Sequence, residues 1–134
     1  MTTLTIDLKL KEIIDGLDNK DYESFKKEIL KLSNNLSINT DKNSDLVIIS
    51  NNFTKNNINN SDIEKECRSI IVNKKDLSIV CYTHDNIYYN EEAKNFLLNK
   101  DITKTRKIYE CYEGTLLTIY NFEDEWNMST RKCI

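Results

Sequence analysis

The first third of the chain spaces its apolar residues as amphipathic helices do. Between about Thr5 and Leu32 these residues recur at the period of a helix with one buried face. They are Ile6, Leu10, Ile13, Ile14, Leu17, Tyr22, Phe25, Ile29, and Leu30 or Leu32. Gly16 interrupts the pattern where it can end one helix, and Asn19 or Asp21 can cap the next. We therefore predict two helices, whose apolar stripes we expect to form core rather than a partner-binding face.

The middle of the chain alternates polar stretches with a short apolar run. Residues 33–45 and about 51–61 are rich in Asn, Ser, Thr and Asp and predict loops. Between them Leu46-Val-Ile-Ile-Ser50 predicts a buried strand, because it is a continuous apolar run of strand length. We expect a helical N-terminal part over residues 1–45 and a β-rich part over residues 46–134.

Two β-rich runs then flank a short polar turn. Residues 67–73 and 77–82 carry the β-branched and aromatic side chains typical of strands, and Lys74-Lys75-Asp76 separates them. This arrangement predicts a hairpin in which Cys67 and Cys81 lie nearly opposite each other. We expect these two cysteines to pack together rather than to form a disulfide.

The last third predicts a short helix followed by strands. Residues 91–100 suit a helix, and residues 106–112, 115–120 and 126–132 suit strands, with 121–125 as the turn that joins the last two. The whole pattern predicts an α+β fold in which two N-terminal helices pack on a mostly antiparallel sheet. At 134 residues the chain is expected to be a single domain.

Composition and charge exclude several classes of protein. The net charge of −3 creates no field that draws the molecule onto nucleic acid or an anionic membrane, so any nucleic-acid contact must be local. The N-terminus lacks the basic and apolar segments of a secretory signal, and no run is long enough to span a bilayer. We expect a cytoplasmic protein with no membrane partner. The four cysteines form no CxxC pair and the chain has one histidine, so we expect free thiols and no metal site.

One run in the last third contains the residues of a known chemical motif. Ile108-Tyr-Glu-Cys-Tyr-Glu-Gly-Thr-Leu-Leu117 is followed one hairpin later by Trp126-Asn-Met-Ser-Thr-Arg131. It resembles the nucleotide-attachment segment of the covalent nucleotidyltransferases, the superfamily of RNA and DNA ligases and mRNA capping enzymes. It is most similar to the N-terminal part of phage-type or large-DNA-virus RNA ligases. Their motif is Lys-x-Asp/Glu-Gly-x-x-Leu, with a basic residue about one hairpin downstream.

The match covers every motif position except the first. Glu113, Gly114 and Leu117 occupy the later positions, Arg131 stands at the downstream basic position, and Cys111 takes the place of the lysine. The resemblance implies binding of ATP or GTP with magnesium, and in the family the lysine attacks the α-phosphorus. It also implies that the acidic residue orients the sugar or the lysine, that the glycine admits the nucleotide, and that basic side chains neutralise phosphate charge.

An upstream segment extends the resemblance. Glu66-Cys-Arg-Ser-Ile-Ile71 is similar to the Glu-x-Arg-Gly-Ile strand that precedes the attachment lysine in phage-type RNA ligases, with Ser69 in place of the glycine. Arg68 is accordingly a candidate phosphate ligand. The resemblance covers about Glu66 to Ile134, and the family's catalytic domain has further strands, so we expect an incomplete nucleotidyltransferase-like part. It also implies a viral source and a place in the infected-cell cytoplasm.

Strand geometry would bring the candidate residues together. Alternation along a strand would place Cys111, Glu113 and Thr115 on one face. A turn centred near Glu123 would set Arg131 across from Thr115, so that an acid and a guanidinium flank one pocket. The alternative is a surface hairpin with a weakly stabilising Glu/Arg pair and a glycine that forms a β-bulge.

No other residue replaces the missing lysine. Lys107 lies four residues before Cys111, about 13 Å away at roughly 3.3 Å per residue, which is too far for the same attack. A thiolate is a good nucleophile, but Glu110 and Glu113 oppose its formation at Cys111. We expect a pseudoenzyme that binds a nucleotide, or an RNA or DNA end, and is inactive or defective in covalent transfer. The alternative is a non-catalytic interaction domain, or a truncated remnant, whose C-terminal edge strand pairs with another protein.

Overall fold

The computed structural model describes residues 7–52, 61–84, 87–88, 90–98, 110 and 112–134. The chain divides into two compact units, one of residues 1–85 with 116–134 and a smaller one of residues 86–115. The smaller unit contains helix α4 (Asn90–Leu98), which confirms the described part of the helix predicted over residues 91–100. In this unit the ring of Phe96 stacks on that of Tyr88, with centroids 4.6 Å apart. Among the described residues no helix is long and apolar enough to cross a membrane.

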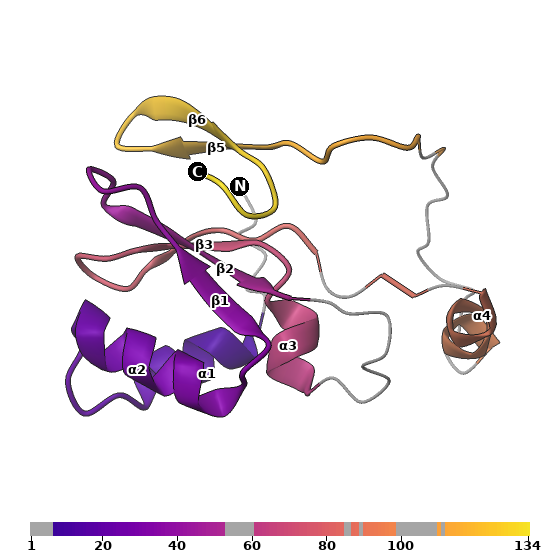
Figure 1. Cartoon of the computed structure of the whole chain (residues 1–134), viewed down its shortest axis with the longest axis horizontal. Coiled ribbons are helices and arrows are strands. Elements are labelled where there is room, and N and C mark those ends of the chain that lie inside the picture. Colours follow the sequence, from indigo (N-terminus) through magenta and orange to yellow (C-terminus); the bar gives the residue numbers. More distant parts are fainter. Residues whose placement is uncertain (1–6, 53–60, 85–86, 89, 99–109, 111) are drawn as a thin grey trace. The chain divides into compact units, whose positions relative to one another are not determined.

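The larger unit is an antiparallel sheet with helices on one face and a hairpin on the other (Figure 1). The sheet has the strand order β1-β2-β3-β4, and β5 and β6 form a separate two-stranded hairpin. The elements are α1 (Lys9–Asp15), α2 (Tyr22–Leu32), β1 (Leu36–Asn39), β2 (Leu46–Asn51), α3 (Asp62–Glu66), β3 (Ile70–Asn73), β4 (Ile79–Cys81), β5 (Thr118–Phe122) and β6 (Glu125–Ser129). The predicted α+β class, with two N-terminal helices on an antiparallel sheet, is confirmed.

Strand β2 lies at the centre of the core because both of its faces are covered. Val47 and Ile49 pack in one apolar cluster with the helices. Leu46 and Ile48 pack in a second cluster on the opposite face, where Tyr120 of β5 covers them. All six residues of the strand are buried. This explains why the strand is a continuous apolar run in the sequence instead of an alternating one.

Two short elements were not predicted. Strand β1 lies within residues 33–45, so the prediction of a loop there is wrong for the part that pairs with β2. Its two apolar residues, Leu36 and Ile38, are too few to reveal a period, and the pairing with β2 makes this segment a strand. Helix α3 has five residues, which is also too short for a helical pattern.

Cys67 does not lie opposite Cys81, contrary to the prediction. The preceding residues form α3, and Cys67 ends that helix, so strand β3 begins only at Ile70. The residue paired with Cys81 is Ile71. The described thiols of Cys67, Cys81 and Cys133 are free, as expected.

The β5–β6 hairpin is tighter than predicted. Its turn consists of Glu123 and Asp124, which have φ angles of 53° and 63°, instead of the five residues 121–125. Two consecutive residues with positive φ are typical of the two-residue turns that match the twist of antiparallel strands. Strand β6 ends at Ser129, before Arg131. The placement of Arg131 across from Thr115 stays a prediction, because the two residues belong to different units.

Candidate nucleotide-binding site

Arg131 is anchored at the end of strand β2. Its Nη2 atom donates to the backbone oxygen of Asn51 at 2.9 Å and to the Oδ1 atom of the same residue at 2.7 Å. Asn51 is buried, and its own side-chain amide donates to the backbone oxygen of Glu64. The Nε atom of Arg131 is buried without a partner among the described residues. The linear motif did not identify Asn51 as the partner of Arg131. The sequence did contain a signal for it, because Asn51 is a polar residue directly after an apolar run.

Arg68 belongs to the same end of the sheet. Ile49 pairs with Ile70 in the β2–β3 register, and continuing this register sets Arg68 beside Asn51. The Asn51 N–H donates to the backbone oxygen of Cys67 at 2.8 Å, so the two segments remain side by side there. The structure thus brings both arginines that were predicted to bind phosphate to the end of β2.

One residue along each strand from Asn51 and Arg68, three cross-strand neighbours in the sheet are serines. Ser37 pairs with Ser50 and shares a 3.0 Å hydrogen bond with it, and the β2–β3 register sets Ser69 on the other side of Ser50. These serines face away from the helices, because they alternate with residues of the helix-facing cluster. The Oγ atoms of Ser69 and of Ser129, in β6, are buried without a partner among the described residues. Such a hydroxyl costs about 1–3 kcal/mol when it stays unsatisfied.

Of the predicted attachment motif, Cys111, Glu113 and Gly114 belong to the smaller unit and Leu117 belongs to the larger one. Glu113 and Gly114 are exposed and form a bend instead of a strand. The predicted strand face shared by Glu113 and Thr115 is therefore wrong, and so is the alternative of a β-bulge at Gly114. A Cβ atom added to Gly114 would meet nothing within 4 Å, and the φ angle of this glycine is not positive. Cys111 lies outside the described residues, and the pairing of Glu113 with Arg131 stays a prediction because the two belong to different units.

The described thiols do not provide an alternative nucleophile in the core. Burial, together with the nearby charge of Glu66, raises the pKa of the Cys67 thiol to about 12, and burial also raises the pKa of Cys81. Both thiols are protonated at neutral pH and therefore unreactive. In the described part of the chain, no three His, Cys, Asp or Glu side chains gather to hold a metal ion. A magnesium ion implied by the resemblance would be held mainly by the phosphates of the nucleotide.

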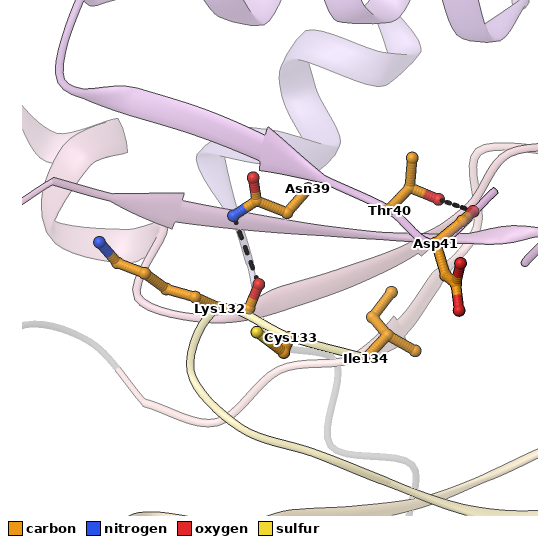
Figure 2. A pocket seen from close by; sticks show the side chains of 6 residues that line it. All are labelled: Asn39, Thr40, Asp41, Lys132, Cys133 and Ile134. Atoms are coloured by element: carbon orange, nitrogen blue, oxygen red, sulfur yellow. Dashed lines mark hydrogen bonds between the residues drawn. The ribbon is translucent and has the colours of Figure 1, made fainter.

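A separate hollow of about 460 Å³ lies between the end of β1 and the C-terminal segment (Figure 2). It is lined by Asn39, Thr40, Asp41, Lys132, Cys133 and Ile134. The Nδ2 atom of Asn39 donates to the backbone oxygen of Lys132 at 3.3 Å and links the two walls (Figure 2). None of the predicted site residues lines this hollow.

Comparison with known proteins supports the resemblance in part. The chain is 29% identical over 73 residues to the "Putative bifunctional polynucleotide kinase/RNA ligase" of Autographa californica nuclear polyhedrosis virus. The similarity indicates a distant ligase-related relationship. It spans 49% of this chain and 10% of the viral protein, so the activities of that whole protein do not follow from it. No protein-family model matches the chain, and no solved structure matches it.

Proposed function

We propose that this chain is an RNA ligase-like protein that binds a nucleotide or an RNA end and does not form the covalent nucleotidyl intermediate. The proposal depends on one observation: Cys111 stands at the lysine position of a motif whose later positions, Glu113 and Gly114, match. The partial similarity to a viral polynucleotide kinase/RNA ligase supports the ligase part of the proposal.

In this proposal the phosphates bind at the end of strand β2. Asn51 already holds one nitrogen of the Arg131 guanidinium, so little side-chain freedom remains to be lost when an anion binds. Arg68 supplies a second positive charge, and the unsatisfied hydroxyls of Ser69 and Ser129 supply neutral donors. Hydrogen bonds from a guanidinium to phosphate are among the stronger ones in proteins, because the charge assists them.

Covalent transfer requires an unprotonated nucleophile at the first position of the motif. In the family a lysine amine forms a bond to the α-phosphorus while pyrophosphate leaves. A cysteine thiol must first lose its proton, and the carboxylates of Glu110 and Glu113 disfavour the thiolate at Cys111. A bound nucleotide is therefore expected to dissociate unchanged.

Labelling with a nucleotide tests both parts of the proposal. The wild-type protein, Cys111→Lys and the control Cys133→Lys are incubated with magnesium and with ATP or GTP labelled at the α-phosphate. We expect all three proteins to bind nucleotide in calorimetric titrations, and only Cys111→Lys to acquire label that stays with the denatured protein on a gel. Label on the wild-type protein would contradict defective transfer. A lack of binding by all three proteins, both to nucleotide and to the end of an RNA oligonucleotide, would contradict the proposal as a whole.

A second candidate function is that of a non-catalytic interaction domain. It is favoured by the outer face of the β5–β6 hairpin, where Ile119, Trp126 and Met128 are exposed. Contiguous exposed apolar patches often mark interaction sites in soluble proteins. If the labelling experiment finds no nucleotide binding, and Trp126→Ala abolishes binding to a protein partner, this second function is the correct one.

A further inference from the structure

The outer face of the β5–β6 hairpin is apolar and exposed. Ile119, Trp126 and Met128 have 66%, 76% and 59% of their surface exposed. Ile119 pairs with Met128, and Asn121 pairs with Trp126, so alternation sets all three apolar side chains on one face. The opposite face is covered, since Tyr120 packs against the sheet. The hairpin therefore has a buried inner face and an apolar outer face that nothing in the described part of the larger unit covers.

Strand β6 also presents an open edge. Among the described strands it pairs with β5 alone. In a two-residue hairpin the pair that closes the turn, here Phe122 and Glu125, is hydrogen-bonded, and hydrogen-bonded pairs recur at every second residue from there. The backbone N–H and C=O groups of Trp126 and Met128 therefore point to the open edge. An open edge that also has exposed apolar side chains is a template for pairing with another strand.

We propose that the strand that pairs with this edge is β6 of a second copy of the chain. Antiparallel pairing about a two-fold axis at Asn127 would join the two hairpins into one continuous sheet. In this register Trp126 lies opposite the partner's Met128, and their outward-pointing backbone groups exchange hydrogen bonds. Methionine sulfur also makes favourable contacts with aromatic rings. Both exposed apolar faces then become parts of one larger surface.

Charge complementarity favours a second copy as the occupant. Glu125 lies opposite the partner's Ser129, so the paired strands contain no pair of like charges. The same pairing sets the acidic turn of Glu123 and Asp124 near the partner's Ser129, where β6 ends and the chain leads on to the basic residues Arg131 and Lys132. The interface is self-complementary, so it closes as a dimer and does not propagate into a fibre.

Sedimentation velocity over a wide range of protein concentration tests the proposal. We expect a concentration-dependent species of twice the monomer mass of 15.8 kDa. Met128→Pro removes a backbone N–H that hydrogen-bonds to the partner in this register and should give a monomer. Ile119→Lys changes the same exposed face away from the open edge and should leave the dimer intact, with circular dichroism to show that both variants fold. A wild-type protein that stays monomeric, or equal loss of the dimer in both variants, would overturn the proposal.

A disulfide across the two-fold axis provides a second measurement. Asn127 would face the partner's Asn127 in a non-hydrogen-bonded pair, and the short Cβ separation of such pairs suits a disulfide. In a Cys133→Ser background, Asn127→Cys should give a covalent dimer on mild oxidation, whereas Asn121→Cys on β5 should not. A protein that sediments as a dimer but shows no cross-link at residue 127 would overturn the proposed pairing.

Discussion

Glu66 caps helix α1 by accepting a hydrogen bond from the backbone N–H of Leu10 at 2.9 Å, across 56 residues of sequence. Its other carboxylate oxygen accepts from the N–H of Lys9 at 2.8 Å. Leu8, which precedes the helix, has no side-chain acceptor that could do this. The first turn of α1 is therefore satisfied by the last residue of α3, and the two helices depend on each other.

Glu66→Ala is expected to lower the free energy of unfolding by about 2 kcal/mol, because it leaves two N–H groups of the α1 N-terminus without their acceptor. Chemical denaturation of the variant and the wild-type protein measures this difference. Glu12→Ala changes an exposed carboxylate on the same helix and should cost less than about 1 kcal/mol. Equal losses in the two variants would show that the cap does not stabilise the fold.

The pKa of Glu64 in the folded state predicts that the fold loses stability in acid. Burial acts to raise the pKa of its carboxyl, but hydrogen bonds from Ser33, Asn35 and the backbone N–H of Ser61 outweigh burial and hold the pKa below its usual value. A carboxyl whose pKa is lowered in the folded state stabilises the fold above its unfolded pKa of about 4.3. This contribution is lost as the pH falls through the folded-state pKa.

The measurement compares Glu64→Gln with the wild-type protein by denaturation at neutral pH and at about pH 3. The variant should be less stable at neutral pH, and the difference should shrink in acid, where the wild-type carboxyl is protonated as well. Glu28→Gln, at a more exposed site, controls for the loss of one surface carboxylate. A stability difference at Glu64 that does not change with pH would contradict the lowered pKa.

Arg131 should contribute more to nucleotide binding than the neighbouring Lys132. Arg131→Gln removes charge-assisted hydrogen bonds worth about 1.5–3 kcal/mol, which weakens ATP binding by roughly ten- to a hundredfold. Lys132→Gln removes the same charge from a side chain that donates to Asn52 Oδ1 at 3.1 Å, and is the matched control. Calorimetric titration with ATP and magnesium measures both. Equal weakening by the two substitutions would attribute binding to net charge and not to the anchored guanidinium.

The elements that the sequence predicts well are those whose own residues decide them. The apolar period of α2 and its cap by Asp21, which accepts from the Ser24 N–H at 2.9 Å, are local features, and the structure confirms both. The apolar run of β2 likewise predicts a strand buried on both faces. In each case the signal lies within a few residues of the position that it describes.

The errors occur where partners distant in sequence decide the outcome. The strand β1 exists because β2 lies beside it, and Cys67 ends a helix because the short α3 precedes β3. The turn between β5 and β6 was predicted in the right place, but with the five residues 121–125 instead of the two residues Glu123 and Asp124. The expected strand face of Glu113 was wrong, since residues 112–117 do not pair with another described strand.

The sequence by itself determined the α+β class, the two N-terminal helices and the candidate arginines, because hydrophobic periodicity and a linear motif are properties of neighbouring residues. Only the tertiary structure decided that Arg131 is held by Asn51, that Arg68 belongs to the same end of β2, and that Ser69 and Ser129 keep buried, unsatisfied hydroxyls among the described residues. The physical reason is that strand pairing and burial join residues that are far apart along the chain. No local pattern of side chains specifies which of them will meet.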